Sequence, residues 1–108
     1  MKMIIAIVNS DDAADVGSAL TREHFRYTKV SSTGGFLKTG NTTLLIGTSD
    51  DLLETALRTI EDHCATRSVS VAPSSLAELN PYDMYTTRDV TVGGATVFVL
   101  DAERMIKF

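Results

Sequence analysis

The fold is decided by a short run near the N-terminus, Met3-Ile4-Ile5-Ala6-Ile7-Val8. Every residue of this run is apolar, and most are β-branched. A strand with no polar face is typical of the middle of a sheet that is covered on both sides or by a partner chain. The run is too short for the core of a signal peptide or for a membrane span. We therefore expect a cytoplasmic protein without membrane contact.

Helical and extended patterns follow this strand in a regular order. Residues 11–23 repeat apolar side chains at helical spacing, after polar residues suited to cap a helix. A β-leaning segment at 25–33 leads through the glycine-bounded loop 34–40 to a second apolar strand at 41–47. A second helix then places one set of side chains on a common face: Leu53, Ala56, Leu57, Ile60 and Cys64.

The C-terminal third is less regular. Residues 67–72 have the composition of a short strand, and 73–87 lack any period, so we predict a long, mobile loop there, with 74–87 ordering when a ligand binds. Residues 89–100 alternate around Gly93-Gly94, which predicts a hairpin, and 101–108 form a tail with one helical turn. The order β-α-β-β-α-β with an enlarged loop predicts an α+β, ferredoxin-like fold in one domain, residues 1–108.

The composition limits the partners of this domain. The 108 residues are 44% hydrophobic and 22% charged, with a formal net charge of −4 and no run of Lys or Arg. A protein that binds long nucleic acids needs a basic stripe, so this class of partner is excluded. A small phosphorylated ligand needs only one or two cations and remains compatible with the composition. The single cysteine, Cys64, falls in a helical pattern and is expected to be a buried small hydrophobe.

Signals of catalysis are missing from the sequence. His24 and His63 are the only histidines, and both fall near predicted helix ends, where capping or surface roles are usual. No spacing of Cys and His suits a metal, and no phosphate-loop, dinucleotide or nucleophile-elbow motif is present. The acidic pairs at 11–12 and 50–51 sit at helix starts, where the helix dipole favours them. We therefore expect no enzyme activity, no metal and no cofactor.

The stretch between the two predicted middle strands can form a binding site. Arg26 and Thr28 lie two apart on a strand, so they present a cation and a hydroxyl on one face, about 6.6 Å apart, which suits a phosphate. The loop Gly34-Gly35-Phe36-Leu37 can expose backbone N–H groups, with Phe36 placed to stack on a base. Asn41 carries the amide that matches an adenine edge. The alternative is a plain turn flanked by solvated side chains.

These segments together resemble the PII-like cyclic di-AMP receptor family. The resemblance extends over the whole chain except about residues 74–87, and three separated motifs occur in the family's order. The segments that carry it are Met1 to Val8, Phe25-Arg26, Thr28-Lys29, Thr33-Gly34-Gly35-Phe36-Leu37, Gly40-Asn41-Thr42-Thr43, and Val92-Gly93-Gly94-Ala95-Thr96-Val97-Phe98-Val99-Leu100. It implies a PII-type signal transduction protein, a homotrimer that binds cyclic di-AMP between subunits and signals to an unknown downstream protein.

The resemblance also implies which residues contact the ligand. Positions that match family contacts are Arg26, Thr28, Gly35, Phe36, Leu37, Asn41 and Gly47. Two further contact positions depart from the family pattern: His24 stands where the family has Asn, and Lys107 where it has Gln. Both side chains can still donate a hydrogen bond, so we expect altered affinity with the same ligand. Phe98 is assigned to the core.

Two other functions stay open on the sequence. One is a PII-type sensor of ATP or ADP, which the loop of about seven residues after the second strand disfavours, because PII proteins resemble this fold but carry a much longer loop there. The other is a structural or interaction trimer whose nucleotide site has decayed, with His24 and Lys107 as the marks of decay.

Overall fold

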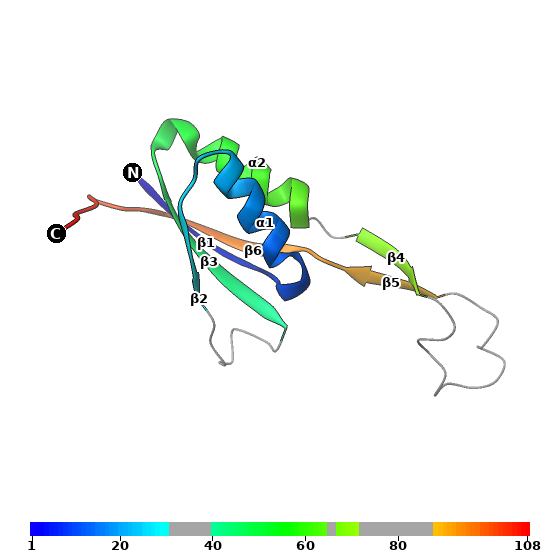
Figure 1. The fold of residues 1–108 in the computed structure, drawn as a ribbon. Helices are drawn as coiled ribbons and strands as arrows, with labels where there is room; N and C mark the ends of the chain where they lie inside the picture. Colours follow the sequence, from blue (N-terminus) through cyan, green and yellow to red (C-terminus); the bar gives the residue numbers. More distant parts are fainter. Residues whose placement is uncertain (31–39, 65–66, 72–87) are drawn as a thin grey trace.

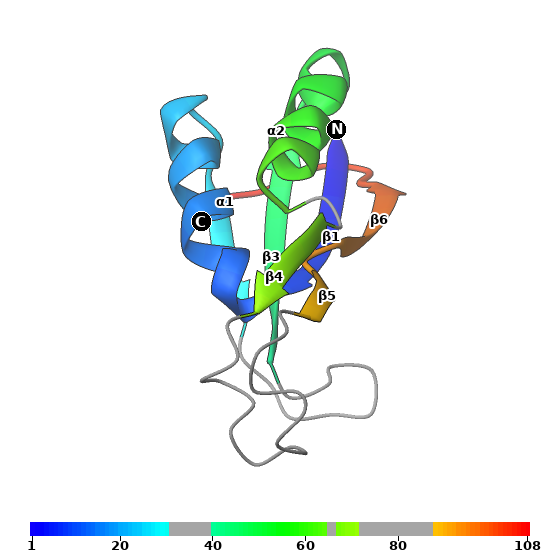
Figure 2. The same cartoon turned by 90° about the vertical axis from the view of Figure 1, so that its right-hand side faces the viewer.

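A four-stranded antiparallel sheet with two helices on one face forms the body of the protein (Figures 1 and 2). The computed structural model describes residues 1–30, 40–64, 67–71 and 88–108. The strand order β2-β3-β1-β6 confirms the predicted ferredoxin-like α+β fold. The elements of the body are β1 (Lys2–Asn9), α1 (Ser10–Arg22), β2 (Tyr27–Val30), β3 (Asn41–Thr48), η1 (Asp50–Leu52), α2 (Leu53–Cys64) and β6 (Ala95–Asp101).

The central strand β1 divides its side chains between the two faces of the sheet. Ile4, Ala6 and Val8 are fully buried beneath the helices, together with Leu44 and Ile46 of β3. The alternate residues point away from the helices and remain half-buried or exposed in the single chain: Met3, Ile5 and Ile7 of β1, Leu45 of β3, and Phe98 and Leu100 of β6. We call this second surface the open face. These six side chains are as apolar as those of the core.

Phe98 lies on this open face, where the single chain does not bury it. It is 42% exposed, so its assignment to the core is wrong for the chain described by itself. The register explains its position, because Phe98 lies opposite Ile5 and the buried residue Ile4 lies opposite Val99. Phe98 and Ile5 therefore point to the side of the sheet that lacks helices.

Local signals in the sequence set the helix ends. The Asn9 side chain accepts a hydrogen bond from the Asp11 backbone N–H at 2.9 Å and so caps α1, which begins and ends one residue before its predicted bounds. The second helix is entered through the single 3-10 turn η1. Residues 102–108 form no helix, so the helical turn predicted in the tail is wrong.

A second, two-stranded sheet projects from one end of the body and forms an arm, at the opposite end from the two chain termini (Figure 1). Its strands are β4 (Arg67–Val71) and β5 (Arg88–Val92). The predicted hairpin around Gly93-Gly94 is wrong, because β5 pairs with β4 and β6 pairs with β1. The two glycines instead connect the arm to the body. Their φ values are +83° and +88°, which residues other than glycine rarely adopt.

One ion pair ties the arm to the body. Asp12, in the first turn of α1, is only 4% exposed, and its carboxylate accepts hydrogen bonds from the Arg67 guanidinium at 2.7 and 3.4 Å. The Gly94 backbone N–H also donates to the Cys64 carbonyl. The sequence suggested only a dipole role for Asp12, but the structure gives its carboxylate a cation from another element.

Three predictions are not tested by the described residues. The loop at 74–87 lies outside them, and the single-domain organisation and the cytoplasmic location stay predictions. Neither α1 nor α2 has the length and apolarity that a membrane crossing requires, within the part of the chain that the structure describes.

We expect Asp12→Asn to lower the free energy of unfolding by about 1.5–3 kcal/mol, because it removes charge-assisted hydrogen bonds from a buried position. Urea denaturation measures this loss. The matched control is Asp11→Asn, one residue earlier in the same helical turn but exposed, which should cost less than about 1 kcal/mol. Equal losses in the two variants would contradict a special role for the Asp12–Arg67 pair.

Candidate functional site

Two of the predicted site residues, Arg26 directly before β2 and Thr28 within it, lie toward the open face. Tyr27 points to the helix face, where it packs against Gly17 of α1: a Cβ at Gly17 would lie 2.7 Å from the Tyr27 ring carbon Cζ, so residue 17 has no room for a side chain. Tyr27 also lies opposite Ile46 in the register. Because strand residues alternate, Arg26 and Thr28 face the other way, toward the open side of the sheet.

Two adjoining clefts meet beside Arg26, Gly47 and Met105, which line both. The larger, of about 490 Å³, lies where β2 begins and β3 ends; the smaller, of about 290 Å³, continues over the open face. We call them together the β2–tail cleft. Its remaining lining residues are Met1, His24, Phe25, Thr48, Ser49, Leu52 and Lys107 in the larger part, and Met3, Tyr27, Thr28 and Leu45 in the smaller part.

Five of the nine predicted contact residues line this cleft: His24, Arg26, Thr28, Gly47 and Lys107. They come from three parts of the chain that are distant in sequence, namely the start of β2, the end of β3 and the C-terminal tail. Gly47 leaves space there, since a Cβ at this position would meet no atom within 4 Å. The structure therefore brings these five together.

The backbone structure at the C-terminal end of α1 determines the position of His24. Its φ of +66° is in the left-handed region. Its backbone N–H donates to the Thr21 carbonyl at 3.0 Å, and the next N–H, of Phe25, donates to the Leu20 carbonyl at 2.9 Å. These two bonds form a Schellman motif, whose left-handed position is usually glycine or asparagine. This backbone motif therefore places His24 in the lining of the larger part of the cleft.

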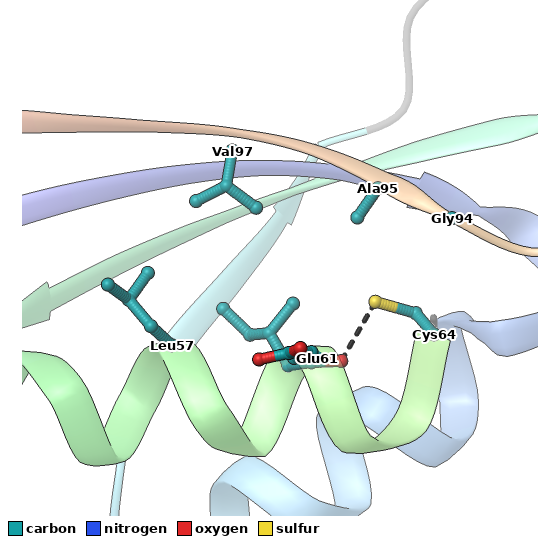
Figure 3. Close-up of a pocket in the computed structure, with 7 residues that line it drawn as sticks. Leu57, Glu61, Cys64, Gly94, Ala95 and Val97 are labelled. Carbon is teal, nitrogen blue, oxygen red and sulfur yellow. Dashed lines mark hydrogen bonds between the residues drawn. The ribbon is translucent and has the colours of Figure 1, made fainter. Parts of the chain in front are cut away.

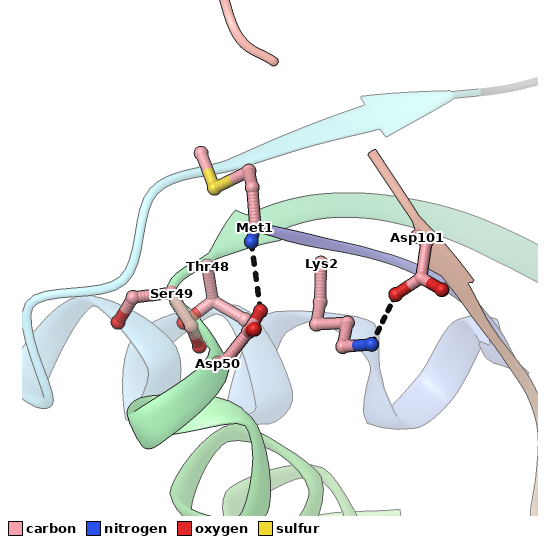
Figure 4. A network of polar contacts seen from close by, with 6 residues as sticks. All are labelled: Met1, Lys2, Thr48, Ser49, Asp50 and Asp101. Carbon is pink, nitrogen blue, oxygen red and sulfur yellow. Dashed lines mark hydrogen bonds and ion pairs between the residues drawn. The ribbon is translucent and has the colours of Figure 1, made fainter. Parts of the chain in front are cut away.

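Charges around the cleft are unequally compensated. The Met1 amino group donates to Asp50 at 2.7 Å, which lowers the pKa of that carboxyl below its usual value, and Lys2 pairs with Asp101, which raises the pKa of Lys2 (Figure 4). These acids therefore have cations of their own. By contrast, no ion pair or side-chain hydrogen bond to Arg26 or Lys107 is found within the described residues.

Two cations beside apolar side chains suit a ligand that is both anionic and partly apolar. Arg26 and Lys107 can bind phosphate oxygens, with Arg able to do so through two parallel N–H groups. Met105 and Leu52 of the same cleft offer apolar surface. The cleft is therefore matched to an anion that also carries an apolar group. Met105 was missed on the sequence, where it was only one apolar residue in a tail.

Asn41 lies away from this cleft. It begins β3, whereas Gly47 stands near the end of the same strand, so about 20 Å separates them. Asn41 lines a different hollow of about 240 Å³, which it shares with Asn9, the glycines 93–94 and Thr96. Within one chain, the structure does not bring Asn41 to Arg26. The predicted contacts Gly35, Phe36 and Leu37 lie outside the described residues.

A further hollow, between α2 and β6, contains none of the predicted contact residues (Figure 3). Cys64 lies at its end, where its thiol donates to the Ile60 carbonyl at 2.8 Å, and burial raises its pKa. This confirms Cys64 as a buried side chain and makes it a poor nucleophile. Among the residues described, no three Asp, Glu, His or Cys side chains are grouped to hold a metal ion.

Two comparisons with known proteins bear on this site. The family model described as "Cyclic-di-AMP receptor" matches residues 1–108. The structure is also similar to the crystal structure of a functionally unknown protein from Pediococcus pentosaceus ATCC 25745, with 36% sequence identity and a TM-score of 0.78. That match covers 99% of this chain and 96% of the other.

Proposed function

The chain belongs to the cyclic-di-AMP receptor family, and from this premise we propose that it binds cyclic di-AMP at sites shared by neighbouring subunits and signals through loop rearrangement. The observation that carries the proposal is the β2–tail cleft, where Arg26 and Thr28 meet Gly47 and the cations are uncompensated by the described residues. A receptor family favours a binding protein over an enzyme. Our proposal includes the finer statement that the chain carries out no chemistry.

The phosphates bind at Arg26 and Thr28 in this proposal. Arg26 and Thr28 flank Tyr27 at the start of β2, and both line the smaller part of the cleft. Lys107 adds a second cation in the larger part of the cleft, and His24 adds a ring nitrogen near it. These two residues therefore change the strength of binding without changing the class of ligand.

The adenine is read by Asn41, whose amide can pair with the adenine edge, and Gly35 to Leu37 supply backbone donors and a stacking face. Guanine presents a carbonyl where adenine presents an amine, so the Asn41 contact discriminates between the two bases. The residues from 35 to 37 enter on the family resemblance, because they lie outside the described part of the chain.

The separation of Asn41 from Arg26 supports a site between subunits. Asn41 begins β3, whereas Arg26 shares a cleft with Gly47, about 20 Å further along that strand, so a single chain does not offer both to one nucleotide. Two copies can do so if Asn41 of one approaches Arg26 of the next. The apolar open face also favours assembly, since monomers rarely expose large contiguous apolar surfaces. We propose a closed homotrimer in which these faces meet.

Loop rearrangement completes the proposal. The segment 74–87 combines two features on the sequence: many turn-forming residues, and more apolar side chains than a linker needs. In our proposal it orders when cyclic di-AMP binds, and an unknown downstream protein responds to that state. Ordering costs about 1–2 kcal/mol per residue, which ligand contacts must supply.

The function is tested by calorimetric titration of the purified protein against cyclic di-AMP, cyclic di-GMP and ATP. We expect tight binding of cyclic di-AMP and much weaker binding of the other two. A preference for ATP would favour the PII-type sensor of ATP or ADP. Absence of heat with all three would favour a trimer with a decayed site.

A second prediction concerns Arg26→Ala. Loss of one charged hydrogen-bond donor should weaken cyclic di-AMP binding by about 1.5–3 kcal/mol. The melting temperature without ligand should change little, because Arg26 has no side-chain partner among the described residues. A large fall in that melting temperature would identify Arg26 as a structural residue and contradict its assignment to the site.

The assembly has its own measurement. Multi-angle light scattering at micromolar concentration should give three times the chain mass of 11.7 kDa, without ligand as well as with it. The physical reason is the apolar open face, which must be covered. The mass of a monomer or dimer would contradict the proposed trimer.

A further inference from the structure

The two most exposed apolar residues that line the larger part of the β2–tail cleft lie outside the core. Leu52, the last residue of η1, is 47% exposed, and Met105, in the C-terminal tail, is 61% exposed. Both lie in the cleft that also contains Arg26 and Lys107. Neither belongs to the buried core cluster. Their exposure keeps apolar area in water, which a bound apolar group would cover.

Their position beside the cations indicates which part of a ligand they contact. The phosphate of a nucleotide goes to Arg26, so the base must lie within one nucleotide's reach of it. Met105 and Arg26 both line the two parts of the cleft, so a base close to Arg26 also lies close to Met105. A thioether packs favourably against an aromatic ring, and the cleft of about 490 Å³ has room for a purine.

The tail that carries Met105 is anchored at its start. The Ala102 backbone N–H donates to the Met1 carbonyl at 3.1 Å, directly after β6 has paired with β1. This bond fixes where the tail leaves the sheet, close to the end of β3 that contains Gly47. The fold thus delivers Met105 to the cleft, while the side chain itself stays exposed.

We propose that Leu52 and Met105 form an apolar seat for one purine ring of the ligand, and that Met105 sets a preference for purine over pyrimidine. This inference rests on the proposed function and adds a specificity-determining residue to it. The seat is separate from Asn41, which stands at the other end of β3. A pyrimidine, with one ring in place of two, covers less of the two side chains and gains less from them.

The test compares cyclic di-AMP with cyclic di-UMP by calorimetry, for the unaltered protein and three variants. Met105→Ala should weaken cyclic di-AMP binding by about three- to tenfold, because the apolar side chain that covers the ring is lost, and should weaken cyclic di-UMP binding less, so that the preference for purine over pyrimidine narrows. Met105→Leu, which keeps apolar bulk, should retain most of the affinity. The matched control is Ile106→Ala, since Ile106 is the next tail residue, is 52% exposed and lies outside the cleft lining.

The outcomes separate this inference from the function on which it rests. Unchanged affinity in Met105→Ala, or an equal loss for both cyclic dinucleotides, would overturn the purine seat while leaving the receptor function intact. An equal loss in Ile106→Ala would also overturn it, because the effect would then belong to the tail as a whole. Absence of cyclic di-AMP binding by the unaltered protein would overturn both proposals. Melting curves should be alike for all four proteins, since both tail residues are exposed.

Discussion

The structure depends on one constraint: β1 is apolar on both faces, yet the helices cover only one. In the observed register of β1 against β3 and β6, Ile4, Ala6 and Val8 are buried beneath α1 and α2. Alternation then forces Met3, Ile5 and Ile7 onto the open face. A shift of β1 by one residue would bury Met3, Ile5 and Ile7 in place of Ile4, Ala6 and Val8. Because both sets are apolar, contacts with the helices and the neighbouring strands must determine which set is buried.

The same constraint determines where a ligand can bind. Tyr27 packs against Gly17 on the helix face, which leaves Arg26 and Thr28 on the open face beside Gly47. A cation and a hydroxyl thus stand at the edge of the surface that is proposed to meet another copy. Under the proposed function, recognition and assembly use the same side of the sheet. This arrangement gives a ligand contacts to more than one chain when the copies come together.

Much of the fold could be predicted from local patterns. The apolar run 3–8 and the helical spacing in both helices gave β1, α1 and α2 within one or two residues, because these signals arise from neighbours in sequence. The partner of a strand is not such a signal. Gly93-Gly94 has the composition of a hairpin turn, but β6 pairs with β1 and β5 with β4, so tertiary pairing overrides the turn.

The candidate site likewise contains some residues that the sequence predicted and others that depend on tertiary structure. The period of two on a strand was sufficient to group Arg26 with Thr28, and the family resemblance added Gly47, His24 and Lys107, all of which line one cleft. The left-handed backbone of His24 and the pairing of buried Asp12 with half-exposed Arg67 depend on neighbours that the sequence does not reveal. The same holds for Met105, whose role in the cleft depends on the path of the tail.

The most direct test of the shared site is complementation between two defective subunits. Arg26→Ala and Asn41→Ala chains, each expected to bind cyclic di-AMP only weakly when alone, are co-expressed with different tags, and mixed trimers are isolated and titrated. If each site takes Arg26 from one chain and Asn41 from the next, every mixed ring of three chains contains one junction that joins the two intact residues, so about a third of the sites regain unaltered affinity. Restoration of none, with both variants folded and trimeric, would contradict the account and place both residues in one chain's site.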